Sequence, residues 1–189
     1  IATRVDYPDA LRALLGQTVA AAALFSAHTK INGRLGIQLK GQGALRTLFA
    51  EYATGGTLRG IALWQEPLPV ALTPRDFGRH ALLAITIETL PPGADEPTRY
   101  QGLVGLDSDR LDHAFEAYFV SSEQLPTRLL LCADGSRAAG LLLQQLPGES
   151  ADPDGWTRAQ ALFDTLQPAE LLASDPEDLL YRLFHEDGV

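Results

Sequence analysis

The stretch Arg34-Leu-Gly-Ile-Gln-Leu-Lys40 alternates apolar and polar residues, which is the pattern of a β-strand with one buried face. The pair Asn32-Gly33 precedes it as a turn signal, and Gly41-Gln-Gly43 ends it. This strand predicts a sheet that buries its apolar side, and the neighbouring segments indicate how that sheet is built.

Segments on the C-terminal side repeat the strand pattern. Strands are predicted at residues 58–64, 81–88, 99–106, 126–132 and 139–146. The last two flank the turn signal Asp134-Gly135 and are expected to form a hairpin. In contrast, Ala44–Ala53 (ALRTLFAEYA) is predicted to be a helix that begins after the glycines at 41 and 43.

A long helix is predicted from Pro8 to about His28, because leucines recur there at helical spacing. Its second half, Ala20–Leu24, carries small uncharged residues, which is typical of a helix buried between layers. Further helices are predicted at residues 108–122, 154–165, 168–172 and 176–185. For the last of these, Ser174 and Glu177 are the expected capping box.

The order of these elements predicts an α+β fold: two mostly antiparallel sheets packed with helices, followed by a small helical region. Consecutive strands without intervening helices favour this class over a doubly wound parallel sheet. Residues 1–148 are expected to form the core domain, and residues 149–189 the helical region.

The composition restricts the function classes. The chain has 189 residues, of which 46% are hydrophobic, so it is long enough to bury a core. A net charge of −9 argues against a nucleic-acid or anionic-membrane surface. No uninterrupted apolar run approaches the ~20 residues of a membrane span. A single cysteine excludes an internal disulfide and a cysteine-based zinc site within the chain.

The sequence carries no motif that predicts a catalytic, cofactor-binding or metal-binding residue. Gly41-x-Gly43 follows a strand, as phosphate-binding loops do, but the third glycine of a dinucleotide fingerprint falls at Arg46. We interpret it as a strand-to-helix turn. His113 and Glu116 would share a helix face, yet two ligands do not make a zinc site.

Cys132 is the residue on which an enzyme alternative depends. It ends the apolar strand segment Leu129–Cys132, which predicts a buried and inert thiol. A catalytic Cys132 assisted by His80, His113 or His185 stays open as the alternative.

Short motifs along most of the chain follow one order. They are Asn32–Leu35, Gln38–Gly43, Leu58–Gly60, Tyr100–Leu106, Ser122–Arg128, Ala138–Gln144, Glu170–Leu172 and Leu180–Glu186. In this order they resemble the heat-shock protein 33 family of redox-regulated holdase chaperones. The most specific segment of the resemblance is Ser122–Arg128 (SEQLPTR).

The resemblance implies a cytoplasmic chaperone without catalytic turnover, typically a homodimer, that binds unfolding proteins. It also implies a linker and a small module whose Cys-x-Cys and Cys-x-x-Cys bind zinc when reduced. Oxidation of those cysteines to disulfides releases zinc and exposes apolar surface. This chain ends at Val189, where that linker would begin, and Cys132 matches none of the four cysteines. We therefore expect a fragment, clipped at Ile1 as well, that lacks the redox switch and the zinc module.

Six apolar residues are the predicted client-binding candidates. They are Tyr118, Phe119 and Leu125 near a predicted loop, and Leu179, Leu183 and Phe184 on the terminal helix. Ordinary core packing is the competing interpretation for each. Without the switch, we expect the chain either to bind clients constitutively or to expose a patch that the linker would cover. The remaining alternative is a dimerisation scaffold whose client surface lies elsewhere.

Overall fold

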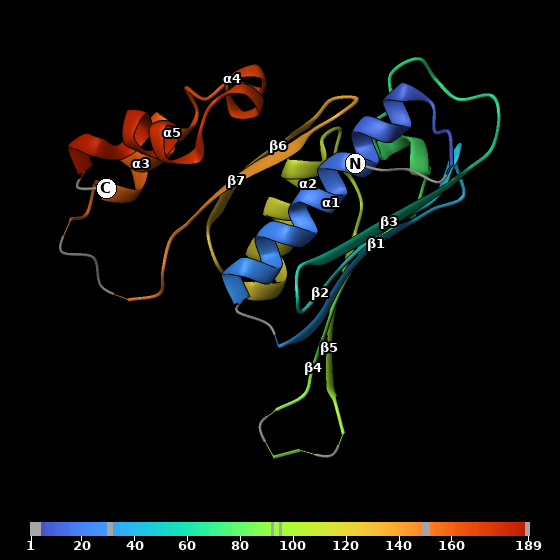
Figure 1. The fold of residues 1–189 in the computed structure, drawn as a ribbon, viewed down its shortest axis with the longest axis horizontal. Helices are drawn as coiled ribbons and strands as arrows, with labels where there is room; N and C mark the ends of the chain where they lie inside the picture. The colour runs from blue at the N-terminus through green and yellow to red at the C-terminus, as the bar shows by residue number, and fades with distance from the viewer. Residues whose placement is uncertain (1–4, 30–31, 92, 95, 149–151, 188–189) are drawn as a thin grey trace.

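Strand β1 (Gly33–Lys40) is the centre of a five-stranded sheet with the order β3-β2-β1-β4-β5, in which all neighbours pair antiparallel. The computed structural model describes residues 5–29, 32–91, 93–94, 96–148 and 152–187 (Figure 1). The other strands of this sheet are β2 (Leu45–Ala53), β3 (Thr57–Trp64), β4 (Leu82–Thr89) and β5 (Thr98–Gly105).

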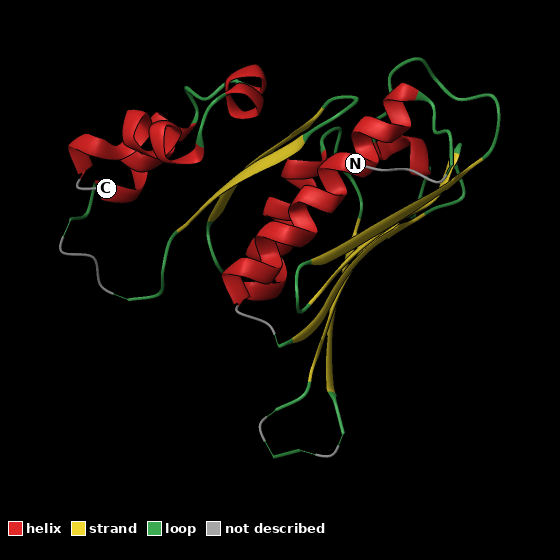
Figure 2. Ribbon diagram, in the orientation of Figure 1, coloured by secondary structure: helices red, strands yellow, loops and turns green. Residues whose placement is uncertain are grey.

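The remaining elements form further layers beside this sheet. Helix α1 (Asp9–Thr29) lies between it and the hairpin of β6 (Thr127–Ala133) and β7 (Ala138–Gln144), with α2 (Leu111–Tyr118) next to α1 (Figures 1 and 2). On the far side of the hairpin lie α3 (Gly155–Phe163), α4 (Pro168–Ala173) and α5 (Pro176–Phe184). Three short turns are η1 (Pro74–Phe77), η2 (Phe119–Glu123) and η3 (His185–Asp187).

This layering confirms the predicted α+β class with antiparallel sheets and a helical C-terminal region. The division of the chain at residue 148 stays a prediction, and residues 149–151 lie outside the described part.

The hairpin β6–β7 is buried on both faces. Leu129 and Leu131 point into the main core with α1 and α2, whereas Leu130 and Cys132 belong to a second cluster with the C-terminal helices. Since successive side chains of a strand alternate between faces, each core takes every second residue. Burial on both faces explains why this segment is continuously apolar.

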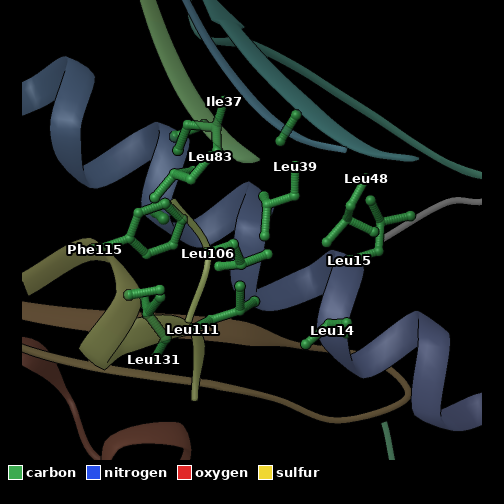
Figure 3. Close-up of a cluster of buried hydrophobic side chains, with 14 of the residues drawn as sticks. Leu14, Leu15, Ile37, Leu39, Leu48, Leu83, Leu106, Leu111, Phe115 and Leu131 are labelled. Carbon is green, nitrogen blue, oxygen red and sulfur yellow. The ribbon is translucent and has the colours of Figure 1, made fainter. Parts of the chain in front are cut away.

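Helix α1 is the element around which the main core is built. Leu14 and Leu15 lie among side chains from the sheet, α2 and β6, including Ile37, Phe115 and Leu131 (Figure 3). By length and composition alone, Asp9–Ala27 could cross a membrane, with a mean hydropathy of 1.4. Its contacts with both sheets are instead those of a core helix, which agrees with the helix buried between layers that the sequence predicts.

The prediction of a helix at Ala44–Ala53 is wrong, because the segment forms the strand β2. Its Leu, Arg, Ala and Glu residues favour a helix, but intrinsic propensity is a weak bias that tertiary pairing overrides. The pairing with β1 and β3 places Leu48 opposite Leu39 and Ala62, so its inward side joins the core.

Gly41-Gln-Gly43 is consequently a strand-to-strand connection and not the start of a helix. The carbonyl oxygen of Phe77 accepts hydrogen bonds from the backbone N–H groups of Gln42 and Gly43, at 2.9 and 2.8 Å. A Cβ at residue 41 would lie only 2.0 Å from that oxygen. The glycines therefore allow two backbone segments to touch, and the donors of a phosphate loop are already taken.

Two predicted helix ends also differ from the structure. The N-cap of α5 is Asp175, whose side chain accepts from the backbone N–H of Glu177 at 2.9 Å, whereas Ser174 ends α4. The helix predicted for residues 108–122 begins at Leu111 as α2 and changes at Phe119 into the π-helical turn η2.

We predict that Gly41→Ala lowers the free energy of unfolding by about 1–3 kcal/mol, because the added methyl group must displace backbone atoms of η1. Gly105→Ala in β5 is the matched control, since a Cβ there meets nothing within 4 Å. Denaturant unfolding of both variants measures the difference. Equal stability of the two would contradict the close approach at residue 41.

Candidate functional site

The outer face of the five-stranded sheet, which points away from α1, is the first candidate surface. No helix among the described residues packs on it (Figure 2). The strand register places one cross-strand row of side chains on this face, apolar except at its centre. In order, the row is Ile61, Phe49, Gln38, Ala84 and Leu103. We call these residues the apolar row.

The ends of the apolar row are exposed to solvent. The exposed fraction is 48% for Ile61 and 58% for Leu103, and the neighbouring Leu63 and Leu82 are exposed as well. Towards the other end of the same face, side chains are charged and paired, as in Arg59–Glu51 at 2.8 Å and Arg99–Glu88 at 3.8 Å. The face therefore has a mostly apolar half, in which Lys40 lies between Thr47 and Leu82, and a charged half with ion pairs.

The second candidate is a pocket on the opposite side of the sheet, with a volume of about 350 Å³. Its walls come from α1, β1, β4, β5, α2 and η2, so we call it the α1–α2 pocket. The lining residues are Phe25, Thr29, Leu35, Ile85, Ile87, Tyr100, Tyr118, Phe119, Glu123 and Leu125. It brings together Tyr118, Phe119 and Leu125, three of the client-binding candidates from the sequence.

Aromatic rings and one carboxylate define the geometry of the pocket. The ring of Phe119 stands edge-on to that of Phe25, with centroids 4.9 Å apart. Glu123 Oε1 accepts hydrogen bonds from the hydroxyl groups of Tyr118, at 3.3 Å, and Tyr100, at 3.4 Å. Burial and the charge of Glu123 both raise the pKa of Tyr118, so the hydroxyl stays a neutral donor.

Local backbone structure brings the Glu123 side chain to this place. After Tyr118, the chain leaves the α-helix for the π-helical turn η2, and Gln124 then adopts a left-handed conformation with φ of 58°. Glu123 and Tyr100 were not predicted as parts of a site. Glu123 lies within the SEQLPTR motif, but its partner Tyr100 is brought to it by the packing of β5 against η2, which no local pattern indicates.

Leu179, Leu183 and Phe184 lie in a different place. They are 4%, 3% and 8% exposed and pack in the second cluster, beneath α5 and against the hairpin. The hairpin separates them from the α1–α2 pocket. The structure thus divides the six candidates into a pocket set and a buried set.

Cys132 belongs to the second cluster. Its thiol is within 3.8 Å of the carbonyl oxygen of Ala139, and burial raises its pKa. A protonated, enclosed thiol is a weak nucleophile, so the geometry speaks against the thiol-enzyme alternative. The chain also does not fit the zinc site that the resemblance implies, because Cys132 is its single cysteine. Among the described residues, no three His, Cys, Asp or Glu side chains are grouped to hold a metal ion.

Arg128, the last residue of the SEQLPTR motif, connects the core to the C-terminal helices. It pairs with Glu116 of α2 at 3.5 Å and with Asp164 at the end of α3. Glu116 also accepts the backbone N–H of Leu129 at 2.8 Å. Burial is the largest influence on Glu116 and raises the pKa of its carboxyl group.

This raised pKa predicts a pH-dependent stability. The folded protein holds the Glu116 proton more tightly than the unfolded chain, so the stabilisation is complete below the unfolded pKa and is lost as the pH rises through the folded pKa. Glu116→Gln should remove this loss. The free energy of unfolding of the wild type, relative to the variant, should fall as the pH rises above the unfolded pKa of about 4.3. Glu186→Gln, which alters an exposed carboxylate, is the control; parallel profiles for wild type and Glu116→Gln would contradict the prediction.

Comparisons with known proteins give one consistent result. The family model described as Hsp33 protein matches residues 1–189. The 33 kDa chaperonin of Hahella chejuensis is 43% identical over 190 residues, covering 99% of this chain and 65% of the relative. That of Chromobacterium violaceum is 38% identical, covering 100% of this chain and 63% of the relative. The chain thus spans slightly less than two thirds of these relatives. The crystal structure of the 33 kDa chaperonin of Thermotoga maritima shares the fold, with a TM-score of 0.72, 22% identity and coverage of 92% of this chain and 62% of that one.

Proposed function

The chain belongs to the Hsp33 family, and from this premise we propose that it is a holdase chaperone, which binds unfolding proteins and prevents their aggregation. Its relatives carry the name chaperonin, and the fold agrees with theirs. The proposal assigns the chain a binding function without catalytic turnover, in the cytoplasm and as a homodimer.

The observation that carries this proposal is the open outer face of the sheet. Large exposed apolar side chains gathered on one face mark a site of interaction with another molecule. Here the two ends of the apolar row are exposed, at Ile61 beside Leu63 and at Leu103 beside Leu82, and Gln38 and the buried Ala84 lie between these ends. The net charge of −9 would keep the protein soluble, through mutual repulsion, while it carries an aggregating partner.

The pocket residues Tyr118, Phe119 and Leu125 are proposed as a second client contact, because they line a concave apolar site. Leu179, Leu183 and Phe184 are buried against the hairpin. They contact a client only when α5 leaves the hairpin, and in the described arrangement they stabilise the fold.

We propose that these 189 residues do not respond to oxidants. The implied switch needs four cysteines that exchange zinc for two disulfides, and the chain contains Cys132 alone. Zinc binding and redox control are proposed for a separate cysteine-bearing module.

We predict that the chain suppresses the aggregation of a chemically unfolded client on dilution, equally with and without peroxide. Light scattering measures the suppression. A strong dependence of this suppression on the oxidant would contradict the proposal of a constitutive holdase. A complete lack of suppression would favour the scaffold alternative, in which clients bind elsewhere.

The double variant Ile61→Ser with Leu103→Ser tests the outer face. Because each substitution removes apolar area that a client would bury, we expect half-suppression to need at least about threefold more protein. The matched control is Val70→Ser with Leu146→Ser, which removes two exposed apolar side chains outside the sheet. The measurement is the same scattering assay, with denaturant unfolding as a check of stability. Equal effects of the two double variants would show that the outer face has no special role.

A further inference from the structure

We propose that the α1–α2 pocket is a selective subsite for client segments in which a large apolar side chain neighbours a lysine or arginine. The apolar side chain enters the pocket, and the Glu123 carboxylate receives the cation. That the occupant is a segment of an unfolding protein rests on the proposed function. The subsite adds a preference among clients that a flat apolar surface does not have.

The size of the pocket sets the apolar part of the ligand. Its volume of about 350 Å³ lies at the lower end of the ~300–1,000 Å³ typical of ligand pockets. Such a space accepts one aromatic or branched aliphatic side chain, and it is too small for an extended segment. Leu35, Ile85 and Ile87 line the sheet side of the pocket, and Phe25 and Phe119 line its helical side.

Charge complementarity sets the polar part of the ligand. Glu123 is the one charged side chain among the described residues that line the pocket, and it is exposed. A cation beside the apolar anchor would therefore meet a carboxylate, and the described residues of the lining present no competing positive charge. A client acid would meet repulsion from the same group.

Two long hydrogen bonds, at 3.3 and 3.4 Å, orient the Glu123 carboxylate towards the pocket before any ligand arrives. Both tyrosine hydroxyls donate to Oε1. Among the described residues, no hydrogen bond reaches Oε2, so this oxygen remains available as an acceptor. A carboxylate that is already oriented loses less conformational entropy on pairing with a cation than one without any partner does.

The backbone of η2 is consistent with a functional position. π-helical turns are rare and occur frequently at functional sites, and a left-handed non-glycine residue such as Gln124 costs free energy. This unusual segment places Glu123 and Leu125 together on the lining of one pocket.

The experiment uses three short fluorescent peptides of glycine and serine with different centres. The centres are Lys-Phe-Lys, Glu-Phe-Glu and Lys-Gly-Lys, so that the anchor and the charge are tested separately. Fluorescence anisotropy gives the affinity of the full chain for each peptide. We expect the wild type to bind Lys-Phe-Lys most tightly, and added salt to reduce its advantage over Glu-Phe-Glu.

Two variants separate the role of the charged Glu123 from that of the apolar lining. Glu123→Gln keeps an oxygen for the tyrosine hydroxyls and removes the charge, so the preference for Lys-Phe-Lys over Glu-Phe-Glu should fall about two- to fivefold. Leu125→Ala, at a half-buried position, should weaken both phenylalanine peptides about equally. Glu186→Gln removes an exposed carboxylate near the C-terminus, and Glu186 does not line the pocket. This variant should change neither the preference between the two phenylalanine peptides nor the affinity for them.

Three results would overturn the inference: an unchanged preference in Glu123→Gln, an equal loss in Glu186→Gln, or binding of Lys-Gly-Lys as tight as that of Lys-Phe-Lys. If aggregation is suppressed and one of these results is found, the subsite fails while the holdase function stands. If aggregation is not suppressed but the preference depends on Glu123, the pocket is a peptide site and the holdase proposal fails.

Discussion

The structure depends on the burial of α1 from two sides. A helix that contacts a sheet on each side must be apolar around most of its circumference, and α1 contacts β1, β2 and β3 on one side and β6 and β7 on the other. Thr18, a fully buried polar side chain of this helix, donates its hydroxyl to the carbonyl oxygen of Leu14 at 2.9 Å. Because most of this helix is covered from both sides, the candidate binding surfaces are the outer face of the sheet, which α1 does not reach, and the α1–α2 pocket, to which only its C-terminal end contributes Phe25 and Thr29.

Much of this architecture could be predicted from the sequence pattern, and the predictions that were wrong have physical causes. Alternation in Arg34–Lys40 identified β1, and small uncharged residues identified a helix between layers. The prediction for Ala44–Ala53 failed because its side chains favour a helix, whereas pairing with β1 and β3 requires a strand. At the start of α5, Ser174 was predicted as the cap, but the adjacent Asp175 also carries an acceptor side chain and is the residue that caps the helix.

The site was less predictable than the fold. The SEQLPTR motif indicated a special segment, and Tyr118, Phe119 and Leu125 do meet in one pocket. The wall opposite them, with Ile87 and Tyr100, depends on the pairing of β4 with β5, which is a tertiary property. For α5, an amphipathic pattern identifies an apolar face but does not say what covers it. Leu179 and Leu183 are buried in one cluster with side chains of α3, α4 and the hairpin.

The hairpin β6–β7 places a constraint on how this protein can change. Leu129 and Leu130 are neighbours in sequence but belong to different hydrophobic clusters. A single strand therefore contributes side chains to both the main core and the second cluster. Inserting one residue into β6 would exchange the two sets of side chains without altering the composition. The length of this strand is thus fixed more tightly than its residue types, and related chains should vary here by apolar substitution while keeping the spacing constant.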